Sequence, residues 1–309
     1  MIKRITKYLF SLIGLAVRKS GKFSLFDLPN KEWSYHQKGY YLKLLDLTVT
    51  DVNSPLITGY RNARNINQHG GGRFFYDDNR QLRLSIQGVN FFINFTDELF
   101  VINEVFATED YNFRTTDAIV VLDIGQNIGA TSLFFAKQEH VKRVYAYELF
   151  PLTYQAAQKN LSLNDTSKII SQNVGLGKDT RELSIPYSIA NKAVMGLNAH
   201  STSEKFPDTT EVKVFVKDVA EEVLKINQLE PGIKLICKMD CEGAEFEILD
   251  QLFKKNVASL IDVYIIEWHD HDTRNIEAQF LKDGFDIIKS TSSNTFTGLL
   301  YAFKKSNDS

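Results

Sequence analysis

Short apolar runs alternate with helix-length amphipathic segments from Ala118 onward, and this alternation constrains the fold more than any other feature of the chain. The runs have the length of buried strands. A helix pattern follows the first run over Asn127–Gln138, and another begins at Pro151. Such alternation favours an α/β fold, in which helices cover both faces of a mostly parallel sheet. The predicted strands are Ile119–Ile124, Arg143–Tyr147, Lys168–Gln172, Ile233–Met239, Val263–Ile266 and Gly298–Phe303.

The residues before this domain, which we place at 118–309, divide into two parts. Residues 1–20 carry apolar side chains at helical spacing opposite basic ones, which predicts a short amphipathic helix. Its apolar stretch is too short to span a bilayer. Packing on its own domain is favoured over contact with a membrane surface. Residues 21–117 form an accessory region, with a helix predicted over Tyr40–Val49 and a hairpin over Leu82–Phe95.

Charge and cysteine content narrow the class of protein. With 36 basic and 38 acidic residues, the chain lacks a general electrostatic attraction for nucleic acid. Its two cysteines, Cys237 and Cys241, are too few for a disulfide framework and are not spaced for a structural zinc site. We therefore expect a cytoplasmic protein, with membrane association through residues 1–20 as the less favoured alternative.

The residues that directly follow the predicted strands are the candidate site, because ligands of open α/β sheets bind at the carboxyl ends of the strands. After the first strand, Asp123 precedes Gly125, Asn127 and Gly129. The glycines permit a tight turn and close approach to the backbone, and the helix start that follows favours a carboxylate. The GxxxG spacing differs from the GxGxxG loop that binds the pyrophosphate of NAD. An NAD-dependent oxidoreductase is therefore disfavoured.

Glu148 ends the second predicted strand and lies 23 positions after Gly125 (148 − 125). An acid about 20 residues past a glycine loop is the usual partner of ribose hydroxyls. A carboxylate can accept hydrogen bonds from both hydroxyls of one ribose. The glycine loop and this acid together predict a ligand that contains adenosine.

Acidic side chains gather after the fourth and fifth predicted strands. Asp240 ends the fourth strand and is a better site candidate than Glu242 and Glu245, which could instead stabilise the start of the next helix. Glu267 and His269 follow the fifth strand, and this pair of residue types is suited to general base catalysis. A divalent metal bound by Asp240, Glu267 and His269 is an alternative use of the same side chains.

These stretches, in this order, resemble the FkbM family of S-adenosylmethionine-dependent methyltransferases over roughly Phe100–Phe303. The most specific motif is the Lys-x-Asp-x-Glu-Gly-Ala-Glu sequence of residues 238–245. The resemblance implies a Rossmann-like class I methyltransferase fold, with a seven-stranded sheet whose last strand is antiparallel, and S-adenosylmethionine as cofactor. Gln126 departs from the family, which commonly has a small residue there. The implied cofactor-binding residues are Asp123, Gly125, Gln126, Asn127, Gly129, Glu148 and, beside the adenine, Asn173.

The resemblance further implies O-methylation of a small-molecule or glycan acceptor, such as a sugar or a secondary metabolite. Transfer from a sulfonium needs an aligned acceptor oxygen and benefits from a base that removes its proton. We expect His269 or Glu267 to be this base, with Asp240 orienting the acceptor and Glu242 binding it. The alternative from another class is a non-catalytic protein that binds a nucleoside or a glycan within an assembly.

Overall fold

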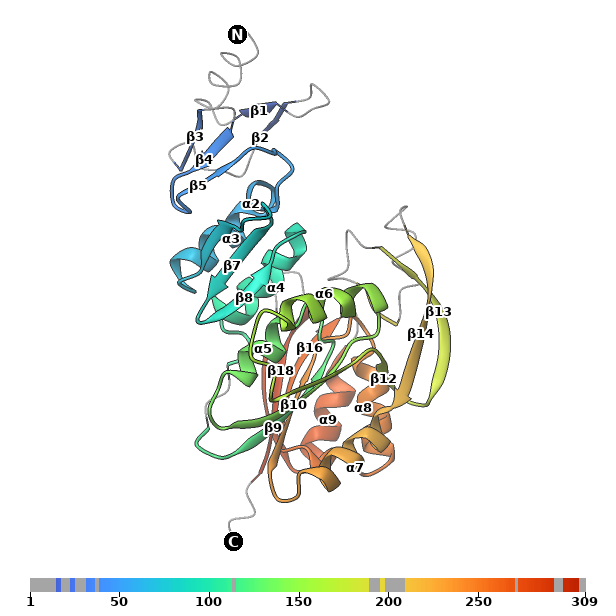
Figure 1. The fold of residues 1–309 in the computed structure, drawn as a ribbon. Helices are drawn as coiled ribbons and strands as arrows, with labels where there is room; N and C mark the ends of the chain where they lie inside the picture. The colour runs from blue at the N-terminus through green and yellow to red at the C-terminus, as the bar shows by residue number, and fades with distance from the viewer. Residues whose placement is uncertain are drawn as a thin grey trace. The chain divides into compact units, whose positions relative to one another are not determined.

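The computed structural model describes residues 15–17, 23–25, 32–36, 39–112, 115–188, 195–197, 209–269, 272–291 and 297–305 (Figure 1). The chain divides into two compact units, an N-terminal unit of residues 1–112 and a C-terminal unit of residues 113–309. This division lies near the boundary that we expected after Asp117. Each unit is described by itself below.

A seven-stranded sheet forms the centre of the C-terminal unit, with the spatial order β11-β10-β9-β15-β16-β18-β17. The pairings from β11 to β16 are parallel, whereas β18 is antiparallel to both of its neighbours. The predicted mostly parallel sheet with an antiparallel last strand is therefore confirmed. The strands are β9 (Ile119–Ile124), β10 (Val141–Tyr147), β11 (Ile169–Gln172), β15 (Lys234–Met239), β16 (Val263–His269), β17 (Phe285–Thr291) and β18 (Thr297–Lys304).

Helices follow four of the five parallel strands, β9, β10, β15 and β16, and cover the sheet (Figure 1). Helix α5 (Ala130–Ala136) packs against β9, β10 and β11, whereas α8 (Glu245–Lys254) packs against α7 (Val219–Leu229), α9 (Arg274–Lys282) and β16. All six residues of β9 are buried, which is why every residue of the strand except Asp123 is apolar. Helix α6 (Pro151–Leu161) begins at the proline, as the sequence predicted.

A smaller sheet in the C-terminal unit has the order β12-β14-β13. Its strands are β12 (Gly175–Gly177), β13 (Arg181–Tyr187) and β14 (Thr210–Asp218). Met195 and Phe150 pack with residues of β13 and β14 in a hydrophobic cluster of their own. This sheet therefore brings residues that are distant in sequence to the end of β10.

The N-terminal unit contains regular structure that the sequence patterns largely missed. The predicted helix over Tyr40–Val49 is wrong, because these residues form strands β4 (Gly39–Leu42) and β5 (Leu47–Val49), joined by a turn in which Asp46 has a φ of +48°. The predicted hairpin is confirmed as strands β7 (Leu82–Ile86) and β8 (Val89–Phe92). The remaining elements are β3 (Trp33–His36), α2 (Pro55–Thr58), α3 (Tyr60–Gln68), β6 (Arg73–Tyr76) and α4 (Thr96–Phe106).

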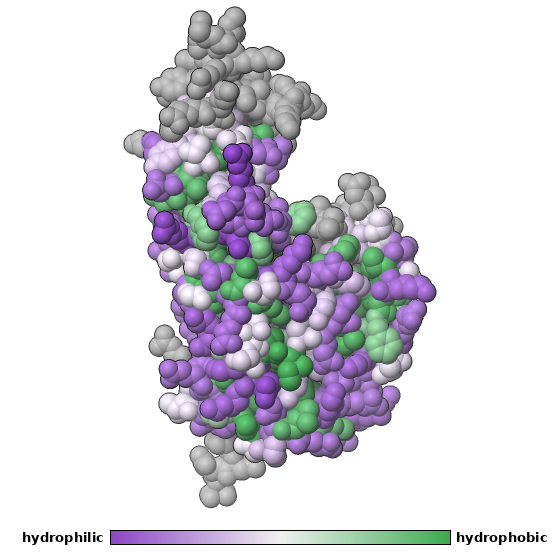
Figure 2. Space-filling model, in the orientation of Figure 1, coloured by the Kyte–Doolittle hydropathy of each residue, from purple (hydrophilic) through white to green (hydrophobic). Residues whose placement is uncertain are grey.

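The predicted amphipathic helix over residues 1–20 is wrong for the part that the structure describes. Strand β1 (Leu15–Val17) pairs in antiparallel fashion with β2 (Phe23–Leu25), and residues 1–14 and 18–20 lie outside the described residues. Among the described residues, no helix is both long enough and apolar enough to cross a membrane. On the face shown in Figure 2, hydrophobic residues are interspersed with hydrophilic ones, as is usual for protein surfaces.

Candidate active site

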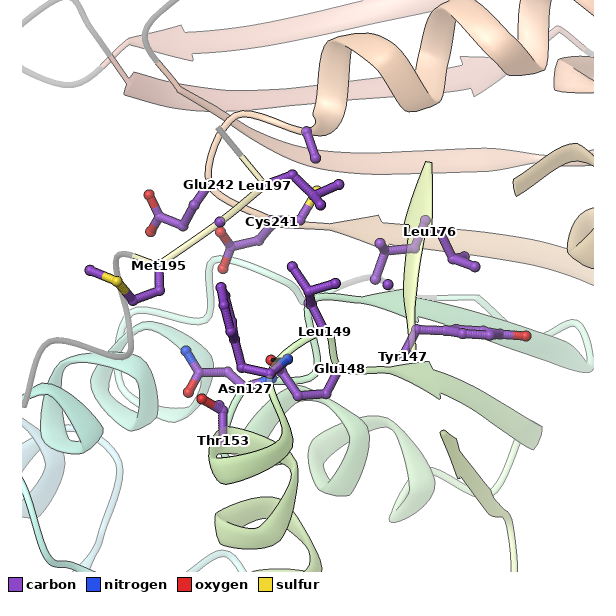
Figure 3. A pocket seen from close by; sticks show the side chains of 17 residues that line it. Asn127, Tyr147, Glu148, Leu149, Thr153, Leu176, Met195, Leu197, Cys241 and Glu242 are labelled. Atoms are coloured by element: carbon purple, nitrogen blue, oxygen red, sulfur yellow. Dashed lines mark hydrogen bonds between the residues drawn. The ribbon is translucent and has the colours of Figure 1, made fainter. Parts of the chain in front are cut away.

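A pocket lies at the carboxyl edge of the large sheet, where β9, β10 and β15 end (Figure 3). Gly125 and Asn127 line it from the loop after β9, Glu148 lines it from the end of β10, and Asp240 and Glu242 line it from the loop after β15. Figure 3 shows Asn127 and Glu148 on one side and Glu242 on the other. Three of the strand ends that the sequence singled out therefore share one crevice.

The loop after β9 requires glycine at position 125. Gly125 has a left-handed φ of +82°, and a Cβ atom there would lie 1.7 Å from the carbonyl oxygen of Asp240. Asn127 is also left-handed, with a φ of +52°, a conformation that asparagine adopts more readily than most residues. Its buried Oδ1 atom has no hydrogen-bond partner in the described part of the chain. This oxygen is therefore available to a donor on a ligand.

Glu148 holds the loops after β9 and β10 together. Its Oε2 accepts a hydrogen bond of 2.8 Å from the backbone N–H of Asn127, and its Oε1 accepts one of 3.0 Å from that of Phe150. Burial raises the pKa of Glu148 to about 7, although these two N–H groups lower it. Each carboxylate oxygen has two lone pairs, so both oxygens can still accept a hydrogen bond from a ligand.

Asp123 lies behind the pocket rather than on its wall. The residue is fully buried, its Oδ2 accepts a hydrogen bond of 2.5 Å from Ser132 Oγ, and Lys238 Nζ lies 3.6 Å from its Oδ1. Burial raises the pKa of Asp123, while Lys238 and Ser132 lower it. Lys238 also donates a hydrogen bond of 2.9 Å to the carbonyl oxygen of Gly125. The aspartate therefore supports the loop after β9 through Lys238.

Gln126, Gly129 and Asn173 do not line the pocket either. Gln126 is buried and accepts a hydrogen bond from Ser171 Oγ. Gly129 is the residue before helix α5, with a φ of +85°. Asn173 donates to the carbonyl oxygens of Glu148 and Leu149. Of the seven predicted cofactor residues, Gly125, Asn127 and Glu148 thus line the pocket, and the other four do not.

Sequence patterns missed the apolar side of the pocket. Leu149 and Phe150 line it after β10, Leu176 lines it from β12, and Met195 and Leu197 line it from the described segment between β13 and β14 (Figure 3). A Cβ atom on Gly196 would lie 2.4 Å from the carbonyl oxygen of Glu242, so this segment packs directly on the loop after β15. The available signal for the first two was their position, because Leu149 and Phe150 directly follow Glu148 at the end of the second predicted strand.

A polar cluster adjoins the pocket at the ends of β15 and β16. His269 Nε2 lies 3.8 Å from Glu242 Oε2 and 3.9 Å from Glu267 Oε1. One carboxylate oxygen each of Asp240 and Glu242 and one ring nitrogen of His269 lie within 4.8 Å of one another. The metal set proposed from sequence had Glu267 in place of Glu242. The structure therefore brings together all of the predicted catalytic residues.

Glu245 connects this cluster to the loop after β15. The side chain is fully buried, its Oε1 accepts a hydrogen bond of 2.9 Å from the N–H of Cys241, and its Oε2 accepts one of 2.8 Å from that of Gly243. His269 Nδ1 lies 3.3 Å from Glu245 Oε1. The glutamate therefore stabilises the loop before helix α8 and orients the histidine at the same time.

The charge state of His269 follows from these neighbours. Burial lowers its pKa, but the hydrogen bond with Glu245 and the negative charges of Glu242 and Asp240 outweigh burial and raise the pKa to about 10. The imidazole is thus protonated at neutral pH. Burial raises the pKa of Glu242, although the positive charge of His269 lowers it.

The strand order, the antiparallel β18, the glycine loop after β9 and the acid that ends β10 define a Rossmann-like class I methyltransferase fold. The family model described as Methyltransferase FkbM domain matches residues 123–287, more than half of the chain. This chain belongs to that family of S-adenosylmethionine-dependent methyltransferases.

Individual relatives are similar over much of the chain. Methyltransferase sdnD from Sordaria araneosa is 26% identical over 214 residues, which cover 62% of this chain and 83% of the relative. Methyltransferase 1 from Beauveria bassiana (strain ARSEF 2860) is 25% identical over 182 residues, which cover 54% of this chain and 72% of the relative. Among solved structures, M. capricolum TrmK in complex with S-adenosyl-homocysteine has a TM-score of 0.36 and 15% identity, covering 67% of this chain and 68% of that one.

Proposed function

We propose that this protein methylates a hydroxyl group of a sugar, a glycan or a secondary metabolite. The observation that carries the proposal is the set of carboxylates, Asp240, Glu242 and Glu267, around His269 at the edge of the pocket. Carboxylates accept hydrogen bonds from hydroxyl groups, so the cluster is suited to an uncharged acceptor with several hydroxyls. Membership in a methyltransferase family supports the transfer itself.

Three features of the pocket fit S-adenosylmethionine. The buried Glu148 keeps lone pairs for ribose hydroxyls, the Oδ1 atom of Asn127 is available to a donor, and Gly125 leaves the backbone of its loop open to close approach. When bound, the cofactor supplies the methyl group of its sulfonium. On transfer, the C–S bond breaks and the sulfur retains the electron pair of that bond. Asp123, Gln126, Gly129 and Asn173 would act indirectly, by holding the loops that make these contacts.

The proton of the acceptor hydroxyl needs a place to go. A protonated His269 donates hydrogen bonds and cannot take this proton. We therefore assign the base role to Glu267, which lies 3.9 Å from His269 Nε2, and the orienting role to Asp240 and Glu242. As the O–H bond breaks, its proton passes to the Glu267 carboxylate, and an electron pair of the oxygen forms the new bond to the methyl carbon.

The test is methyl transfer by the full-length chain with S-adenosylmethionine labelled in its methyl group. Sugars, oligosaccharides and polyhydroxylated metabolites serve as acceptors, and mass spectrometry detects labelled methyl ethers. Label on oxygen supports the proposal, and label only on nitrogen or carbon overturns it. Calorimetric binding of the cofactor without transfer to any acceptor would instead favour the alternative, a non-catalytic binding protein.

A further inference from the structure

We propose that Asp240, Glu242 and His269 bind a divalent cation that holds the acceptor oxygen; this inference rests on the proposed function. The three ligand atoms come from the ends of two neighbouring strands, β15 and β16, and lie within 4.8 Å of one another. Opposite ligands of an octahedral Mg²⁺ are about 4.1 Å apart. Small side-chain rotations therefore bring these atoms to coordination distance.

An independent observation is the support of His269 by Glu245. A histidine that binds a metal commonly donates its other ring N–H to a carboxylate, which fixes the tautomer and orients the ring. Glu245 is fully buried, is held by two backbone N–H groups, and contacts Nδ1 of His269 at 3.3 Å. The remaining ring nitrogen, Nε2, faces Glu242 at 3.8 Å. This carboxylate–histidine arrangement leaves one lone pair directed at the proposed site once Nε2 is deprotonated.

The local charge also favours a cation. Asp240, Glu242, Glu245 and Glu267 bring four carboxylates to this edge of the sheet. Lys238, which lies 3.6 Å from Asp240, lies equally close to Asp123 and so shares its charge between the two. Carboxylates collected in a partly buried place repel one another. A divalent ion bound by three of these side chains offsets this repulsion.

The two carboxylates suit Mg²⁺ and Mn²⁺, whereas the imidazole is a ligand that transition metals accept better than Mg²⁺ does, so the mixed set favours Mn²⁺. Three protein ligands leave coordination positions for water and for the acceptor oxygen. A coordinated hydroxyl loses its proton more readily, as water does on a bound metal, and Glu267 remains outside the ligand set to receive that proton. The metal thus divides the cluster into three ligands, one base and one positioning residue, Glu245.

The experiment measures Mn²⁺ binding to the full-length protein by electron paramagnetic resonance, after treatment with a chelator and dialysis. We expect one Mn²⁺ per chain, displaced by excess Mg²⁺. Glu245→Gln should weaken binding by about 10–100-fold, and Glu242→Gln, which removes a ligand, should weaken it further. The matched control is Glu182→Gln on the exposed face of β13, which should bind as the wild type does. Thermal unfolding and calorimetric binding of S-adenosylhomocysteine verify that each variant is folded.

Two results would overturn the metal site: folded wild-type protein that binds no Mn²⁺, or Glu242→Gln and His269→Ala proteins that bind it as tightly as Glu182→Gln does. Methyl transfer in excess chelator separates this proposal from the proposed function. Full transfer in chelator refutes the metal and leaves O-methylation intact. Specific Mn²⁺ binding without transfer to any hydroxyl supports the site and refutes the proposed function.

Discussion

Gly125 lies against the backbone of Asp240 so closely that a Cβ atom on the glycine would be 1.7 Å from the aspartate's carbonyl oxygen. Gly125→Ala should therefore separate the loops after β9 and β15 and lower the affinity for S-adenosylhomocysteine at least about tenfold, equivalent to about 1.4 kcal/mol. Isothermal titration calorimetry measures this affinity, and urea denaturation measures the accompanying loss of stability.

The matched control for that substitution is Gly232→Ala. Gly232 has a similar left-handed φ, +75°, but nothing lies within 4 Å of the position of its Cβ atom. The free energy of unfolding of the control should fall only by the cost of a left-handed alanine, about 1–2 kcal/mol. Its affinity for the cofactor product should be unchanged. Equal affinities for the two variants would contradict the role given to Gly125.

Lys238 should be among the most costly residues to replace. It is buried and lies 3.6 Å from both Asp123 and Asp240, so Lys238→Met leaves the fully buried Asp123 without its compensating charge. We expect the free energy of unfolding to fall by about 3–5 kcal/mol, measured by urea denaturation. Adding Asp123→Asn should restore part of the loss. In the exposed pair of Lys213 and Glu182, Lys213→Met should change stability by less than about 1 kcal/mol.

Binding of the cofactor product should depend on pH through Glu148. Burial raises the pKa of Glu148 from 4.5 to about 7. The contribution of this group to folding stability is thus fully present below pH 4.5 and is lost as the pH rises through 7. In the proposed binding mode the deprotonated form accepts hydrogen bonds from both ribose hydroxyls, so affinity for S-adenosylhomocysteine should rise about tenfold from pH 6 to pH 8. Calorimetry from pH 6 to pH 8 measures this change in affinity, and the change should be absent in Glu148→Gln.

Glu267→Gln tests the base. Removing a general base lowers kcat by about 10²–10⁴-fold, while cofactor affinity should stay unchanged. The measurement is initial-rate kinetics on the acceptor found in the labelling experiment, with the exposed Asp286→Asn as a control for general effects of removing a carboxylate. Wild-type turnover by Glu267→Gln would be incompatible with the assignment.

The sheet and the clustering of the site were predictable because they depend on short-range patterns. Continuous apolar runs marked the strands, and parallel neighbours necessarily bring their carboxyl ends to one edge. The sequence alone therefore predicted that Gly125, Glu148 and Asp240 share one crevice, as they do in the structure. The error over Tyr40–Val49 arose because its apolar spacing also suits a helix, while Asp46 reverses the chain with a positive φ.

Side-chain direction and distant contacts were not predictable in the same way. Successive residues of a strand face opposite sides, so Ile124 lines the pocket while Asp123 turns away toward Ser132. Met195 reaches the pocket only because β13 and β14 pair around it in a separate sheet. The protonation of His269 depends on Glu245, whose contact with the histidine no local motif reveals.

The reversed direction of β18 has a consequence for selectivity. The parallel strands of the sheet end at the edge that carries the pocket, whereas β18 begins at this edge. Thr297 therefore pairs with His269, and Gly298 pairs with Trp268. The start of β18 therefore lies beside the polar cluster in which we propose that the acceptor binds, and it belongs to neither the loop after β9 nor the end of β10. Under the proposed function, exchanging the side chain at Thr297 should change which acceptor is methylated while leaving the affinity for the methyl donor unchanged.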